Sequence, residues 1–329
     1  NIASGPALKR VTFMGNTADY SGGGMLNDGA SYPTLDEVTF SGNTAIVGGG
    51  MENVESNPTL THVVFSGNSA TGNGGGLDSV ENSSPILTDV TFSGNSAEYG
   101  GGMYCEGGHP VLTDVTFRAN TASNSGGGLA IYAGSLQLVR VAFIGNTATS
   151  VNGGGLWNRE GSPNLRQVSF EGNRAGGNGG GMADEIARGT RLTDVTFRGN
   201  AADGGGGLFV FFYSNPRLER VIFLENVADD YGGGLYNANG SPTLTSVTFS
   251  GNSAASYGGG MATLAGSGES PRLINVMFIT NTAFAGGGLF NKNTAAFPLL
   301  ANVVFYSNTA YGGGGMLNHS SSCLLYTSP

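Results

Sequence analysis

The feature that most constrains the fold of this chain is an internal repeat of about 26 residues. The pattern Leu-x-x-Val-x-Phe-x-x-Asn occurs twelve times, from the repeat that begins at Leu8 to the one that ends at Asn308. A second pattern, Gly-Gly-Gly-(Met/Leu), follows each asparagine after a short gap. Since the fixed positions never vary, we predict that the chain is built from about twelve equivalent structural units.

The residues within one repeat favour β-strands. Val-x-Phe alternates apolar and variable positions, and no 3.6-residue apolar stripe is long enough for a helix. One repeat buries too few side chains to offset the conformational entropy of ordering it, so the repeats must stack. We therefore predict an all-β, single-stranded parallel β-helix of about twelve coils, spaced about 4.8 Å apart. Residues 1–318 form this domain, and residues 319–329 leave the pattern and are expected to be a tail outside the fold.

Each fixed residue type has a structural role in such a coil. The Leu, Val, Phe and Met/Leu positions are predicted to form four inward columns. The asparagine lies where the chain turns, and its side-chain amide can bond to the coils above and below. The glycines permit positive φ and close backbone approach; the alternative, a phosphate-binding loop, lacks the Lys-Ser/Thr that such a loop requires. Cys105 and Cys323 lie about eight coils apart and are expected not to pair.

Composition narrows the range of partners. The chain has 23 acidic and 14 basic residues and a formal charge of −9, which argues against a nucleic-acid partner. It has no apolar run of about 18 residues, so we expect no membrane-spanning segment. The chain begins at Asn1 without a charged and then apolar leader, and we expect a processed chain or a fragment.

The alternation of Phe-x-x-Asn with Gly-Gly-x-(aliphatic) resembles the repeats of the chlamydial polymorphic outer-membrane proteins. The resemblance covers residues 1 to about 318. It implies a right-handed β-helix, a location that is extracellular or on the bacterial outer surface, and an adhesive role as an autotransporter passenger. The third position of the first glycine word is Gly here, where that family commonly has Ala, and this chain contains no C-terminal barrel domain.

Outward positions are where a binding function is expected. The residue after each fixed Met/Leu is the most varied, and strand alternation directs it away from the core. Its aromatic members are predicted to form an exposed platform for sugar rings or a protein partner, unless a loop or neighbouring subunit covers them. These residues are Tyr104, Trp157, Phe209, Tyr236 and Phe290.

Acidic residues gather on two early coils. Glu52 and Asp78 occupy equivalent positions in successive repeats, as do Glu55 and Glu81. Carboxylates about 5 Å apart raise one another's pKa or recruit a hard cation such as calcium. The four residues are thus a candidate calcium site, and a solvated acidic face is the alternative. Two carboxyls at that separation also suit a retaining glycosidase.

Three functions fit these observations. The first is a secreted or cell-surface structural or adhesive protein that binds a host-cell or matrix protein, or a polysaccharide. The second is a carbohydrate-active β-helix enzyme, a lyase or hydrolase, and the third is a non-catalytic carbohydrate-binding module. The spacing between successive ladder asparagines stays between 25 residues (Asn43 to Asn68) and 29 (Asn252 to Asn281), which leaves little room for the irregular loops that build a catalytic cleft. A non-catalytic role is therefore favoured.

Overall fold

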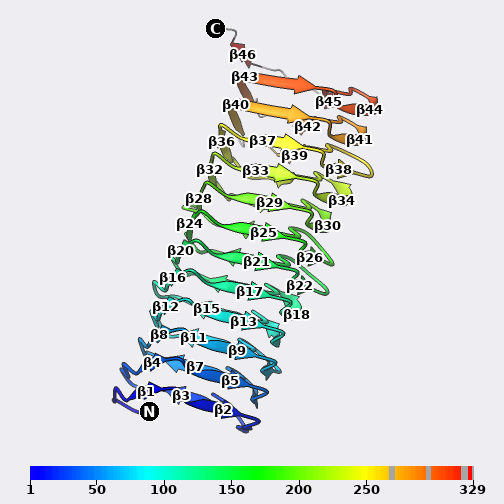
Figure 1. The fold of residues 1–329 in the computed structure, drawn as a ribbon. Coiled ribbons are helices and arrows are strands. Elements are labelled where there is room, and N and C mark those ends of the chain that lie inside the picture. Colours follow the sequence, from blue (N-terminus) through cyan, green and yellow to red (C-terminus); the bar gives the residue numbers. More distant parts are fainter. Residues whose placement is uncertain (267–270, 294–297, 320–324, 328–329) are drawn as a thin grey trace. The chain divides into compact units, whose positions relative to one another are not determined.

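The computed structural model describes residues 1–266, 271–293, 298–319 and 325–327. Its contacts divide the chain into two units, residues 1–164 and 165–329, and each unit holds six repeats. Each unit is a right-handed parallel β-helix in which successive coils lie one above another (Figure 1). The predicted fold class is confirmed. Within the described ranges, no helix has the length and apolar character needed to cross a membrane.

Every coil of the first unit contributes up to four short strands. They are named here by a residue of the repeat: the column leucine, the column phenylalanine, the alanine two residues after the ladder asparagine, and the Met/Leu after the glycine triplet (methionine strands). The leucine strands are β1 (Ala7–Lys9), β4 (Thr34–Asp36), β8 (Thr59–Thr61), β12 (Ile86–Thr88), β16 (Val111–Thr113) and β20 (Gln137–Val139). The phenylalanine strands are β2 (Thr12–Met14), β5 (Thr39–Ser41), β9 (Val64–Ser66), β13 (Thr91–Ser93), β17 (Thr116–Arg118) and β21 (Ala142–Ile144). The alanine strands are β6 (Thr44–Ala45), β10 (Ser69–Ala70), β14 (Ser96–Tyr99), β18 (Thr121–Ser125) and β22 (Thr147–Ala148). The methionine strands are β3 (Met25–Asn27), β7 (Met51–Val54), β11 (Leu77–Val80), β15 (Met103–Glu106), β19 (Leu129–Tyr132) and β23 (Leu156–Arg159).

The second unit repeats the same four kinds of strand. Its leucine strands are β24 (Asn164–Arg166), which begins at the last residue of the first unit, β28 (Arg191–Thr193), β32 (Arg217–Glu219) and β36 (Thr243–Thr245). Its phenylalanine strands are β25 (Ser169–Glu171), β29 (Thr196–Arg198), β33 (Ile222–Leu224) and β37 (Thr248–Ser250), and β40 (Arg272–Ile279) and β43 (Leu299–Tyr306) run through both kinds. The alanine strands are β26 (Arg174–Ala175), β30 (Ala201–Gly204), β34 (Val227–Tyr231), β38 (Ser253–Ala254), β41 (Thr282–Ala285) and β44 (Thr309–Gly312). The methionine strands are β27 (Met182–Glu185), β31 (Leu208–Phe211), β35 (Leu235–Ala238), β39 (Met261–Ala265), β42 (Leu289–Asn293) and β45 (Met316–His319).

The register of neighbouring coils places equivalent residues side by side. In the first unit Leu77 pairs with Met103, and in the second Phe223 pairs with Phe249, both in parallel ladders. The rings of Phe223 and Phe249 stack with centroids 4.7 Å apart and planes 3° from parallel. These columns are buried in the inner coils, as predicted, because each inward side chain there is covered by its equivalents above and below; Phe13 and Phe305 in the terminal coils are half-buried.

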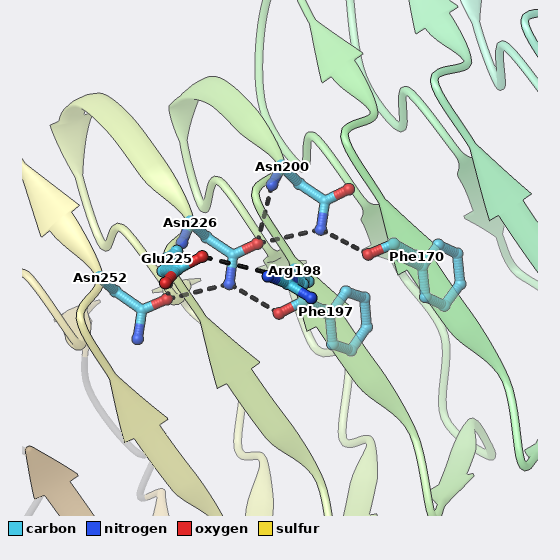
Figure 2. Close-up of polar contacts among 7 residues, drawn as sticks. All are labelled: Phe170, Phe197, Arg198, Asn200, Glu225, Asn226 and Asn252. Carbon is cyan, nitrogen blue, oxygen red and sulfur yellow. Dashed lines mark hydrogen bonds and ion pairs between the residues drawn. The ribbon is translucent and has the colours of Figure 1, made fainter.

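The fixed asparagines form the predicted ladder, and Figure 2 shows part of it in the second unit. The Oδ1 atom of Asn226 accepts hydrogen bonds from the backbone N–H of Asn200 (3.0 Å) and from its Nδ2 (2.9 Å). The Nδ2 atom of Asn226 donates to Oδ1 of Asn252 (2.9 Å) and to the carbonyl of Phe197 (2.9 Å). The amide thus satisfies both of its ends in a fully buried position.

The glycine triplet meets the steric demands expected of it. Gly100, the first glycine of its triplet, has φ +63, which L-residues rarely adopt. A Cβ on the middle glycine, Gly101, would lie 2.4 Å from the carbonyl oxygen of Thr121 and 2.5 Å from that of Gly127. The backbone of the next coil therefore occupies the space that any side chain would need.

Four residues of the predicted tail lie among the described residues. His319 is the last residue of β45, and β46 (Leu325–Thr327) pairs in parallel with β43. These four residues thus have strand geometry. The rest of 319–329, including Cys323, lies outside the described residues, whereas Cys105 is a buried free thiol.

Candidate binding site

The predicted aromatic column lies where strand alternation places it but is not exposed. Tyr104, Trp157, Phe209 and Phe290 are each at most 8% exposed, and Tyr236 is half-buried. The expectation of an open platform is therefore wrong. Its use in binding stays a prediction.

The cover comes from the segment that leads into each glycine triplet. In the first unit the ring of Tyr99, at the end of β14, lies 5.8 Å from that of Trp157. A Cβ on Gly126, the first glycine of its triplet, would lie only 2.7 Å from Cβ of Ala130 in the same column. The chain thus folds back over the position after Met/Leu and forms an outer layer that the repeat pattern does not reveal.

In the second unit this outer layer is itself aromatic. Tyr231, at the end of β34, stacks with Tyr257 at 5.3 Å and lies 5.2 Å from Tyr236. Tyr257 contacts Phe290 at 4.5 Å, and Phe209 lies 5.3 Å from Tyr236. These five residues are called the aromatic layer. Tyr231 and Tyr257 are its half-buried outer members.

A small hollow of about 60 Å³ opens beside the aromatic layer. It is lined by Tyr231, Tyr257, Leu264, Phe290, Lys292 and His319. Burial raises the pKa of Tyr236 to about 12 and also raises the pKa of Tyr231, so both phenols are neutral at pH 7. The ring faces of Tyr231 and Tyr257 can stack on an apolar ring of a ligand. The ammonium group of the exposed Lys292 can donate a hydrogen bond to the polar edge of the same ligand.

The four predicted calcium ligands divide into two pairs. Glu52 and Asp78 are neighbours in the β7–β11 ladder and are 6% and 1% exposed. Glu55 and Glu81 follow in turns with φ of 47° and 52°, and both are exposed. Among the residues that the structure describes, no group of three or more His, Cys, Asp or Glu is placed to hold a metal ion. Calcium binding by this set therefore stays a prediction.

Burial governs the charge of the inner pair. Burial raises the pKa of Asp78 well above the usual range, and the negative charge of the neighbouring Glu52 raises it further. It also raises the pKa of Glu52, against an opposing hydrogen bond from Ser21. Oδ1 of Asp78 and Oε2 of Glu52 have no hydrogen-bond partner. Neither carboxylate is placed to reach a polysaccharide, which disfavours the glycosidase interpretation.

We predict that Asp78→Asn stabilises the protein at pH 7 by about 1–3 kcal/mol, because a neutral amide does not carry the cost of burying or protonating a carboxylate at that pH. Because the folded state holds this proton more tightly than the unfolded state, wild-type stability falls as pH rises above the unfolded pKa of Asp, about 3.9. The gain from the substitution should therefore shrink as pH is lowered towards that value. Urea titrations of both proteins at several pH values between about 4 and 7 measure this difference in the free energy of unfolding.

The exposed Glu81→Gln serves as the control and should change stability by less than about 0.5 kcal/mol. An Asp78→Asn protein that is less stable than wild type at pH 7 would contradict the prediction. Repeating the titration with calcium tests the metal site, since a bound ion would stabilise only the wild type.

Comparison with protein families places the fold. The model of the right-handed beta helix region matches residues 3–175, more than half of the 329. The chain belongs to the right-handed β-helix family. A second model, the Chlamydia polymorphic membrane protein repeat, matches residues 246–260 of this β-helix protein, from the turn before β37 to the end of a glycine triplet.

Two further comparisons add little to the family assignment. No curated protein sequence matches this β-helix protein. Among solved structures, the TibC-catalysed hyper-glycosylated TibA fragment is 17% identical over 97% of this chain and 99% of its own, with a TM-score of 0.27. That likeness is too weak to support an inference.

Sequence reasoning missed the outer rings of this β-helix protein. Tyr99, Tyr231 and Tyr257 occupy one equivalent position, directly before the first glycine of their triplets. Comparing that position between repeats would have shown three tyrosines in one column. The isolated bridge between Tyr231 and Tyr257 confirms that the two lie in register.

Proposed function

We propose that this protein is a secreted or bacterial cell-surface repeat protein that acts in adhesion without catalysis. The observation that carries the proposal is the matched register of the leucine, phenylalanine and methionine strands within each unit. Outward side chains on these strands lie beside their equivalents in the next coil, so these faces are continuous and suit an extended partner. Such a partner is a host-cell or matrix protein, or a polysaccharide.

Two other findings support this proposal. The match to a Chlamydia polymorphic membrane protein repeat associates the chain with surface proteins. The paired carboxylates Glu52 and Asp78, which would have supported a hydrolase, are buried. Adhesion is assigned to the aromatic layer, because three of the five predicted binding residues, Phe209, Tyr236 and Phe290, come together there with Tyr231 and Tyr257.

Beads coated with the full chain should adhere to cultured host cells or to extracellular matrix, and soluble protein should compete. Tyr257→Ala should reduce adherence by about fivefold or more, since truncating a central interface aromatic can remove over about 1 kcal/mol of binding. Tyr311→Ala is the control, because Tyr311 is 89% exposed and lies outside the aromatic layer. Release of reducing ends from polysaccharides by the purified chain would instead support the enzyme.

A further inference from the structure

The leucine strands of the second unit carry an unusual row of cations on their outer face. Arg191 and Arg217 are paired neighbours in the β28–β32 ladder. The row continues through Thr243 to Arg272, on β36 and β40. All three arginines are exposed, whereas the column leucine that follows each arginine on its strand is buried. The three guanidinium groups therefore project from one face.

These arginines line a groove of about 530 Å³. Its walls are formed by Arg191, Thr193, Arg217, Leu218, Glu219, Thr243, Thr245 and Arg272. Among the described residues, none of the three arginines forms an ion pair. The single carboxylate in the groove, Glu219, is paired with Arg220 outside it, and Arg220 also binds Asp194 at 2.6 Å. The groove thus retains a positive charge in a chain whose net charge is −9.

The first unit provides a comparison within the same molecule. The leucine strands β1, β4 and β8 line a groove of about 520 Å³ on the same kind of face. Its cation Lys9 is bonded to Asp36 at 2.6 Å, and His62 contacts the same carboxylate at 3.2 Å. The fold therefore supplies a groove in both units, and among the described residues the cations of the second groove, unlike Lys9, have no carboxylate partner.

We propose that this arginine groove binds a linear acidic polysaccharide, one that carries carboxylate or sulfate groups along its length. Arginine forms bidentate hydrogen bonds with such oxyanions. The strand spacing places Arg191 and Arg217 about 4.8 Å apart at the backbone and Arg272 about 9.6 Å beyond Arg217. A row of that length matches an extended polyanion that runs across the strands better than one small anion.

The lining favours a glycan over a nucleic acid. No aromatic side chain is among the groove residues, so bases would find no stacking platform there. Thr193, Thr243 and Thr245 offer hydroxyls that can bond to sugar hydroxyls. The groove shares no residue with the aromatic layer, so the inference adds a second binding site, and it rests on the proposed adhesive function only for its biological use.

Calorimetry with polygalacturonate and heparin as probes tests the proposal and separates carboxylate from sulfate recognition. At least one polymer should bind the full chain, with neutral dextran as the negative control, and binding should weaken steeply with salt. The triple variant Arg191→Gln, Arg217→Gln, Arg272→Gln should lose about tenfold or more in affinity and show a shallower salt dependence. Arg217→Lys retains the charge but loses the fork, and should bind with intermediate affinity.

A triple variant with the same charge change, Arg118→Gln, Arg140→Gln, Arg174→Gln, is the matched control and should bind within about twofold of wild type. Equal losses in both triple variants, no binding of either polymer, or tighter binding of a single-stranded oligonucleotide would overturn the proposal.

Bead adherence distinguishes the polysaccharide-binding groove from the adhesive function. A groove variant that adheres normally but no longer binds the polymer would show that the polymer is not the adhesion ligand. A chain that binds polymer without adhering would refute the adhesive function alone.

Discussion

Gly101→Ala should lower the free energy of unfolding by more than about 3 kcal/mol, at the upper end of single-substitution effects. The new Cβ would lie 2.4 Å from one carbonyl oxygen and 2.5 Å from another, and both belong to backbone that cannot rotate away. Relief requires the coils to separate, which weakens the inter-coil hydrogen bonds on both sides. Urea titration followed by far-UV circular dichroism measures the loss.

Gly94→Ala is the matched control in the same unit. Gly94 has φ +63 but no atom within 4 Å of its missing Cβ, so alanine there meets only the cost of the left-handed conformation, about 1–2 kcal/mol. The next coil already carries an L-residue at this position, since Ala119 has φ 51. Similar losses for the two variants would show that close coil approach is not the reason for the middle glycine.

Asn226→Asp should be the second severe change, with a loss of about 3 kcal/mol or more at pH 7, because a charge would be buried without compensation. The carboxylate would replace the Nδ2 donor that serves Oδ1 of Asn252 and the carbonyl of Phe197. Oxygen would then face oxygen at both contacts. The loss should be smaller at acid pH, where the side chain is protonated and can donate one hydrogen bond again.

The control for the ladder is Asn275→Asp. Asn275 is exposed, and its Oδ1 accepts a 2.7 Å hydrogen bond from Asn302, which a carboxylate preserves. Its stability should change by less than about 0.5 kcal/mol. If the two aspartate variants have the same pH dependence, the ladder amides are not held in the buried geometry described above.

The interior of each unit could be predicted because it is encoded in the repeat itself. Residues such as Phe223 and Asn226 recur with one identity, and an identity that never changes leaves one arrangement in which all copies are equivalent. The parallel ladders, the stacked rings and the amide chain follow from that equivalence. Handedness came from the resemblance to a known repeat class, because spacing alone does not distinguish the two hands.

The outside could be predicted only in part. Strand alternation placed Trp157 away from the core, but alternation says nothing about a later segment that folds back over it, as Tyr99 does. The same cover separates buried Glu52 from exposed Glu55, although both were assigned to one cluster. Burial on the outer side depends on the path of the variable segment before the glycines, where the repeats differ in length.

The arginine groove was missed for a different reason. Arg191, Arg217 and Arg272 are far apart in sequence and occupy a column whose other members are all uncharged. The total charge of −9 does not indicate where the 14 basic residues lie, so it cannot reveal a local row of arginines. Reading the residue before each column leucine down the repeats would have brought the three arginines together.

The identical stacking surface of every coil also bears on how such chains can change over generations. Each coil offers the next one the same carbonyls, the same amide and the same ring face. A gene that gains or loses one whole repeat by unequal recombination therefore encodes a chain whose new neighbours fit as the old ones did. Small length changes in the variable segments are also accommodated, since the ladder joins asparagines that are 25 residues apart (Asn43 and Asn68) and 29 residues apart (Asn252 and Asn281). The reach of the molecule and the order of its outward residues can thus vary while the interior is preserved.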